Sequence, residues 1–239
     1  MIYVTSDWHG YDFDRVQALF KKANFSENDF CFVLGDVIDR GLYGVKLLLW
    51  LMEQPNIELI LGNHEAMFLA CDFMFRGDME EAISAMNSYE RDLWHLWRQN
   101  GASTTVHSLL NTDRESIGCI LDYLRDAPLY DTVTVGDRDF LLVHSGLGGF
   151  RKDKKMREYI PDELYWHRPE IDERYFDDVT TVFGHTPTLF YGEEHRGKAL
   201  FTDTWIDVDT GAACAETPML LRLDDLTEFY LDETEGGFS

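Results

Sequence analysis

The chain has 239 residues, which suits one large α/β domain. It carries 21 basic and 44 acidic residues, a formal net charge of −23. This balance argues against a nucleic-acid partner, because binding to DNA or RNA depends on Lys and Arg neutralising phosphates. No run reaches the roughly 18 apolar residues that suggest a membrane span, and residues 1–6 lack the features of a signal peptide. The sequence therefore predicts a cytoplasmic protein with no membrane partner.

The first 76 residues alternate between strand-like and helix-like patterns. Strands separated by helices of this length imply parallel crossovers within one sheet. We predict strands at residues 1–6, 30–34 and 57–61, and helices at residues 13–23, 43–54 and 65–75.

The rest of the chain changes character twice. Residues 77–127 are helical and loop-rich, and we interpret them as a helical cap or insert in a single domain covering residues 1–239. After Pro128 short strands dominate, which predicts an α/β fold: a four-layer α/β/β/α sandwich of two mixed sheets flanked by helices. These later strands are predicted at residues 129–135, 140–144, 179–183, 199–202, 206–208 and 219–223.

Polar, metal-binding residue types follow five of the predicted strands at the points where they end. In parallel sheets, ligands bind beyond the carboxyl ends of the strands. Carboxylate, imidazole and amide ligands without thiolates suit Mn, Fe or Zn in a catalytic site better than a structural zinc. Two such ions can clamp the attacking and leaving oxygens of a phosphoryl transfer. The residues concerned lie in the runs Asp7-Trp8-His9, Asp36 to Gly41, Asn63-His64-Glu65, His144-Ser145-Gly146 and Gly184-His185.

Taken in order, these five motifs resemble the calcineurin-like metallophosphoesterases. The set is Asp7-x-His9, Gly35-Asp36-x-x-Asp39-Arg40-Gly41, Gly62-Asn63-His64-Glu65, His144-Ser145-Gly146-Leu147 and Gly184-His185. More narrowly, it is similar to the serine/threonine phosphoprotein phosphatases of the bacterial and phage-lambda type. That branch also includes the symmetrical diadenosine tetraphosphatases.

The resemblance implies a centre of two divalent metal ions, with Mn favoured and Fe or Zn compatible with the same ligands. Asp7 and His9 would bind the first ion, and Asp36 would bridge the two. The second site would be completed by Asn63, His144 and His185.

The resemblance also implies roles for residues around the metals. His64 would protonate the leaving oxygen, and Asp39 would pair with it and fix its orientation. Arg40 would hold the phosphate, with Asn63 beside it. Residues 164–169 resemble a Trp-x-Arg segment of the same branch, which would make Arg168 a second phosphate contact. Residues 97–104 resemble its W-x-x-N-G segment.

The sequence leaves the substrate open. We expect hydrolysis of phosphomonoesters by a water activated at the two metals, with a serine/threonine-type phosphoprotein as the favoured substrate. The alternatives are a symmetrical dinucleoside tetraphosphate and another small phosphorylated molecule. Leu61 stands where the phage-lambda-type pattern has an arginine, so one phosphate contact is absent or supplied elsewhere. The oligomeric state is not decided by the sequence, although it favours a monomer.

Two other enzyme or binding classes are weaker readings. A serine hydrolase needs G-x-S-x-G around its nucleophile, which the sequence around Ser145 does not match. A binding module that has lost its metals is disfavoured because every expected ligand is present. Asp203, Asp207 and Asp209 alternate as on one strand face, and we expect them to form loop or edge hydrogen bonds and not a cation site.

Overall fold

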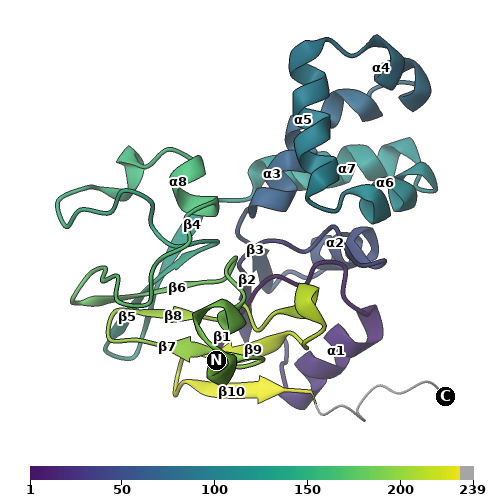
Figure 1. Cartoon of the computed structure of the whole chain (residues 1–239). Coiled ribbons are helices and arrows are strands. Elements are labelled where there is room, and N and C mark those ends of the chain that lie inside the picture. Colours follow the sequence, from purple (N-terminus) through teal and green to yellow (C-terminus); the bar gives the residue numbers. More distant parts are fainter. Residues whose placement is uncertain (232–239) are drawn as a thin grey trace.

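The computed structural model describes residues 1–231, and two mixed sheets lie at its centre (Figure 1). In the first sheet β1, β2 and β3 are parallel and β9 and β10 are antiparallel additions, in the order β10-β9-β1-β2-β3. The parallel pairing of the first three strands confirms the crossovers expected from the sequence. The strands are β1 (Ile2–Thr5), β2 (Phe30–Val33), β3 (Ile57–Leu59), β9 (Met219–Arg222) and β10 (Thr227–Tyr230).

The second sheet has the order β4-β5-β6-β8-β7, with β5, β6 and β8 parallel and β4 and β7 antiparallel at its edges. One apolar cluster joins the facing sides of the two sheets, including Val4 and Phe32 from the first and Leu142 and Val182 from the second. The strands are β4 (Tyr130–Val135), β5 (Arg138–Val143), β6 (Val179–Phe183), β7 (Leu200–Phe201) and β8 (Trp205–Asp207).

Helices cover the outer face of the first sheet. Helix α1 begins after Asp12, whose side chain caps it by accepting from the Arg15 N–H, and it buries Val16 and Leu19 against the sheet. The helices before the second sheet are α1 (Phe13–Lys22), α2 (Gly44–Met52), α3 (Asn63–Ala70), α4 (Met79–Ala85), α5 (Ser88–Gln99), α6 (Ser103–Leu110) and α7 (Arg114–Asp126).

Helices α4 to α7 occupy the segment expected to form an insert, and Figure 1 shows them grouped beyond α2 and α3 at one end of the molecule. They share a core with the first sheet and its helices, since Trp97, Leu109 and Ile120 belong to the same buried cluster as Leu47 and Phe68. A deletion of these helices would therefore expose the main core.

The outer face of the second sheet is covered by the short helix α8 (Asp162–Tyr165) and by irregular chain. Tyr159, Leu164 and Tyr175 fill this layer against Val143 and Phe183. Two mixed sheets flanked by helices confirm the predicted fold class. Strand β10 was not predicted, and helix α3 begins at Asn63, two residues before the expected start. Among residues 1–231 no helix combines the length and apolar character needed to cross a bilayer.

Candidate metal and phosphate site

The structure brings the polar ends of the strands together, as the sequence predicted. Asp7 and His9 follow β1, Asp36 and Asp39 follow β2, and His144 and His185 follow β5 and β6, while Asn63 and His64 begin α3. The first sheet and the second sheet thus contribute to one cluster. All eight side chains are buried.

The backbone at these residues is unusual. Nine non-glycine residues of the described chain have positive φ, and six of them are predicted site residues: Asp7, His9, Asp36, Asp39, Arg40 and His185. Such conformations cost of order 1–3 kcal/mol each and persist only where the surroundings hold them. The turns after β1, β2 and β6 are therefore held in place by other contacts.

Glu65 supplies much of this restraint at the turn after β2. Its carboxylate accepts backbone N–H bonds from Asp36 at 2.8 Å, Val37 at 2.9 Å and Ile38 at 3.2 Å. The turns after β1 and β2 are also joined directly, because the His9 N–H donates to the Asp36 carbonyl at 2.8 Å. Glu65 therefore orients the turn after β2 from its place at the start of α3.

One group of metal-binding atoms surrounds His144 Nε2. The other ring nitrogen of His144, Nδ1, lies 2.6 Å from the Leu34 carbonyl oxygen. Because a carbonyl oxygen can only accept, Nδ1 carries the proton and Nε2 presents a lone pair. The Nε2 atom lies 2.9 Å from Asn63 Oδ1, 3.3 Å from His185 Nδ1 and 3.4 Å from Asp36 Oδ1. Four electron-rich atoms therefore converge.

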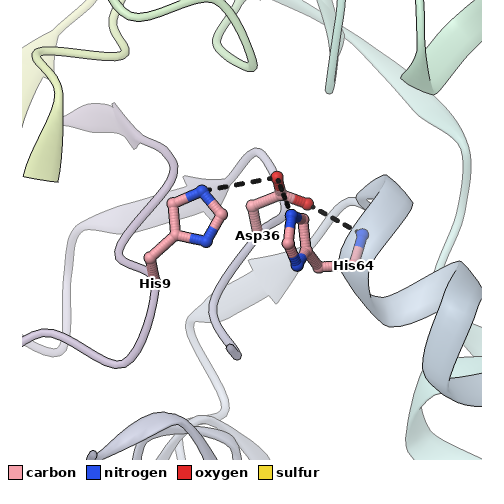
Figure 2. Close-up of side chains that lie close together, drawn as sticks. All are labelled: His9, Asp36 and His64. Carbon is pink, nitrogen blue, oxygen red and sulfur yellow. Dashed lines mark hydrogen bonds and ion pairs between the residues drawn. The ribbon is translucent and has the colours of Figure 1, made fainter. Parts of the chain in front are cut away.

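A second group surrounds His9 Nε2. The ring's Nδ1 lies 3.3 Å from the Ile38 carbonyl, which again leaves the lone pair on Nε2. This nitrogen is 3.7 Å from Asp7 Oδ1 and 3.6 Å from Asp36 Oδ2. Asp7 Oδ1 is buried and has no hydrogen-bond partner among residues 1–231. Figure 2 shows His9 and His64 pointing toward the carboxylate of Asp36.

The two groups fit two divalent cations. Donor atoms that share an ion at about 2.1 Å lie about 3.0–3.4 Å apart, close to most of the separations in these groups. Both histidines donate their other N–H to a backbone carbonyl, as metal-bound histidines do. Burial, together with the charges of Asp7 and Glu65, raises the pKa of Asp36 well above its usual range, so an ionised Asp36 needs a nearby positive charge. Asp36 faces both groups, one through each carboxylate oxygen.

His64 has a different set of contacts. Its Nδ1 lies 2.6 Å from Asp39 Oδ2. Its Nε2 lies 3.2 Å from one terminal nitrogen of the Arg40 guanidinium, and the other terminal nitrogen of that group lies 3.0 Å from His9 Nε2. Burial and the charge of Arg40 lower the pKa of His64 well below its usual range. Because arginine can only donate, His64 Nε2 accepts, and its proton lies on Nδ1 toward Asp39.

A pocket opens over the cluster. Arg40 and Arg168, the two predicted phosphate contacts, both line it, together with His9, Asp36, Asn63, His64 and His185. Two aromatic side chains, Trp166 and Phe190, also border it. Phe190 is 61% exposed, and the Arg168 guanidinium carbon lies 5.9 Å from its ring centre.

Several pocket residues were not predicted from the sequence. Asn100, Trp166, Pro187, Phe190 and Cys214 line the pocket from loops and short helical turns, where no periodic pattern marks them. Trp166 could have been found, since it belongs to the segment that pointed to Arg168.

The expected alternation of three aspartates after β7 is wrong in one respect. Asp207 and Asp209 are buried and accept backbone N–H bonds from Asp209 and Gly211, as loop hydrogen bonding predicts. Asp203 is exposed and pairs with Arg174 at 2.7 Å. The reason is that β8 begins only at Trp205, so Asp203 lies in the preceding turn.

Comparison with known families gives a match over most of the chain. The family model described as calcineurin-like phosphoesterase matches residues 1–210. Among curated proteins, the symmetrical bis(5'-nucleosyl)-tetraphosphatase of Buchnera aphidicola subsp. Schizaphis graminum is 35% identical over 70% of this chain and 59% of its own length. The protein of the same name from Acidovorax ebreus is 28% identical over 80% of this chain and 59% of its own length. The chain thus spans about three fifths of the length of these relatives.

Solved structures agree on the fold. A crystal structure described provisionally as a diadenosine tetraphosphatase has a TM-score of 0.62 at 14% identity, covering 95% of this chain and 90% of its own. A serine/threonine phosphatase from Saccharomyces cerevisiae has a TM-score of 0.55 at 15% identity, covering 97% of this chain and 80% of its own. At these identities the likeness concerns the fold alone.

Proposed function

We propose that this chain, which belongs to the calcineurin-like phosphoesterase family, is a metal-dependent hydrolase that cleaves dinucleoside tetraphosphates symmetrically. The observation that carries the proposal is the make-up of the pocket. Arg40 and Arg168 border it beside the ligand cluster, and so do the rings of Trp166 and Phe190. A polyphosphate between two nucleosides needs both cationic groups and ring surfaces, whereas a phosphoserine needs chiefly a phosphate contact.

The names of the curated relatives support the same substrate class, since both are symmetrical bis(5'-nucleosyl)-tetraphosphatases. The phosphoprotein substrate that the sequence favoured receives no specific support, and the findings favour the alternative reading.

Eight side chains make up the proposed metal and proton-transfer sites. One divalent ion would be held by Asp7 and His9, and the other by Asn63, His144 and His185. Asp36 would contact both ions, and Mn is the favoured metal. When bound, the ions supply charge that neutralises the phosphates and Lewis acidity that activates water. His64 and Asp39 complete the set as the proton-transfer pair.

The chain's own groups then divide the remaining work. Arg40 and Arg168 hold phosphate oxygens in the pocket, where their planar donors suit a bidentate grip. His64 would act as the imidazolium, with a second proton on Nε2 that it gives to the leaving oxygen, and the Asp39 carboxylate would stabilise the positive charge through Nδ1–H. The helical segment 77–127 is proposed as an insert that borders the pocket through Asn100 and limits it to small phosphorylated molecules.

The test is a side-by-side comparison of substrates with the Mn-loaded protein. We expect diadenosine tetraphosphate to give two molecules of ADP, with kcat/KM above that of a phosphothreonine peptide and a phosphotyrosine peptide by at least about tenfold, a difference of about 1.4 kcal/mol. Chromatography of the products distinguishes ADP from an asymmetric mixture of AMP and ATP. A preference for either peptide, or the asymmetric products, would overturn the proposed substrate.

A further inference from the structure

The carboxylate of Asp39 is held by two side chains that come from the helical insert. Thr105 Oγ1 lies 2.6 Å from Asp39 Oδ1, and Trp97 Nε1 donates to Asp39 Oδ2 at 2.8 Å. The Asp39 N–H in turn donates to Thr105 Oγ1 at 2.9 Å, so the hydroxyl accepts from the backbone and donates to the side chain of one residue. Asp39, Trp97 and Thr105 are 0%, 0% and 2% exposed. Water therefore does not replace these donors.

Trp97 is also tied to the helix that carries His64. Its indole stacks on Phe68 with ring centres 5.3 Å apart and an interplanar angle of 21°. Phe68 lies four residues after His64 on α3, and residues at this spacing share one face of a helix. The insert thus contacts the Asp39 carboxylate directly and packs, through Trp97 and Phe68, against the helix that carries His64.

The backbone of the insert reaches the neighbouring residue as well. The Arg40 N–H donates to the Gly101 carbonyl at 3.1 Å, and Arg40 Nε lies 3.5 Å from the Asn100 carbonyl. Asp39 and Arg40 both have positive φ, a conformation that needs such support. The turn between α5 and α6 therefore supports Arg40, while the helices on either side of it supply the donors to Asp39.

These contacts decide which way the imidazole proton points. An Asp39 carboxylate that already accepts from Thr105 and Trp97 remains an acceptor for His64 Nδ1–H, which leaves Nε2 facing the pocket. Burial raises the pKa of Asp39 to about 7, and the hydrogen bonds from Thr105 and Trp97 oppose that rise. Without the two donors the carboxylate would lose both its orientation and part of its preference for the ionised form.

We propose that Trp97 and Thr105 are positioning residues for proton transfer, because they orient Asp39 and through it hold His64 in the geometry that protonates the leaving oxygen. The inference rests on the proposed role of His64 and does not depend on the identity of the substrate. The insert is then a part of the catalytic apparatus as well as a wall of the pocket.

The test uses phenyl phosphates whose leaving groups range from p-nitrophenol to unsubstituted phenol. A good leaving group needs no proton, so a loss of proton transfer slows phenyl phosphate far more than p-nitrophenyl phosphate. We expect Trp97→Phe and Thr105→Val to lower kcat for phenyl phosphate by about tenfold or more and for p-nitrophenyl phosphate by less than about threefold. Thr105→Ser, which keeps the hydroxyl, should restore the wild-type dependence.

Matched controls separate positioning from damage to the fold. Thr104→Val removes a neighbouring hydroxyl that has no hydrogen-bond partner in residues 1–231, and it should leave both substrates unaffected. Thr105→Val should cause no further loss when added to Asp39→Asn, because both act through one carboxylate. Equal losses on all leaving groups, or a Thr105→Ser variant that behaves like Thr105→Val, would overturn the inference.

His64→Asn distinguishes this inference from the proposed function. If His64→Asn does not steepen the dependence on the leaving group, then the role of His64 is wrong and the inference fails with it. If His64→Asn steepens it while Trp97→Phe and Thr105→Val do not, then only the positioning role is wrong.

Discussion

At the scale of single residues, the site is defined by where lone pairs face one another. The proton on His144 points to the Leu34 carbonyl, so its Nε2 presents a lone pair to Asn63 Oδ1 and Asp36 Oδ1. His9 Nε2 faces the Asp7 and Asp36 carboxylates in the same way, although Arg40 also donates to it at 3.0 Å. An arrangement of acceptors facing acceptors is unfavourable in a buried site unless a cation lies among them. This is a stronger argument for metal binding than the residue types alone.

Arg168 offers a test of the substrate at this scale. Its guanidinium lines the pocket beside Phe190. We expect Arg168→Ala to raise KM for diadenosine tetraphosphate about tenfold to 100-fold, since a charge-assisted hydrogen bond contributes about 1.5–3 kcal/mol. The same change should affect phenyl phosphate much less, because that substrate carries a single phosphate.

Steady-state kinetics with both substrates measures this difference. Arg174→Ala is the matched control, since Arg174 pairs with Asp203 on the surface and lies outside the pocket. Equal effects of Arg168→Ala on the two substrates would mean that Arg168 does not contact the extended polyphosphate.

At the scale of elements, strand ends and the turns that follow them carry the site. The sequence was sufficient to predict this much, because each buried strand is apolar and the polar residues begin where it stops. The convergence of β1, β2 and β3 follows from parallel pairing alone. The contacts of Trp97 and Thr105 with Asp39 could not be predicted, since they span 58 and 66 residues and depend on the path of α5 and α6.

The pocket walls were missed for a related physical reason. Phe190 lies in a 3₁₀ turn and Trp166 at the end of a single-turn helix, and neither element has a periodicity that reveals which side faces the site. Strand β10 was missed because it is a short edge strand in which a charged residue, Glu228, separates Thr227 from the aromatic residues Phe229 and Tyr230.

Gly62 tests how tightly the turns must approach each other. A Cβ placed on Gly62 would lie 2.5 Å from the Asp36 nitrogen and 2.7 Å from Glu65 Oε2, and it would also meet Asp36 Oδ1. We therefore expect Gly62→Ala to displace the carboxylate that faces both metal groups and to weaken Mn binding by tenfold or more, about 1.4 kcal/mol. Calorimetric titration of the metal-free protein with Mn measures the change.

Gly118 in α7 is the matched glycine for this comparison. Nothing lies within 4 Å of a Cβ placed there, so Gly118→Ala should bind Mn normally and stabilise the fold by about 0.5–1 kcal/mol. If Gly62→Ala bound Mn as the wild type does, then the close approach at Gly62 would not be needed for the site.

At the scale of the whole molecule, the site joins the two sheets. Asp7 and Asp36 follow strands of the first sheet, and His144 and His185 follow strands of the second. An ion held by ligands from both sheets cross-links them in the folded state and binds the unfolded chain much less. Metal binding should therefore stabilise the whole fold as well as support hydrolysis.

Chelation tests both effects together. We expect EDTA to abolish hydrolysis of p-nitrophenyl phosphate and to lower the thermal unfolding midpoint, and added Mn to restore both. At a free Mn concentration about 100 times the dissociation constant, the folded state gains about 2.7 kcal/mol.

The exposed carboxylates of a chain with a net charge of −23 also attract divalent ions, so a rise in the unfolding midpoint with Mn needs a control. Asp36→Asn is that control, since this change removes the carboxylate common to both groups and leaves the surface intact. The variant should show almost no rise in its unfolding midpoint with Mn. A rise equal to that of the wild type would place the stabilising ions on the surface. Activity that survived full chelation would contradict the metal-dependent account.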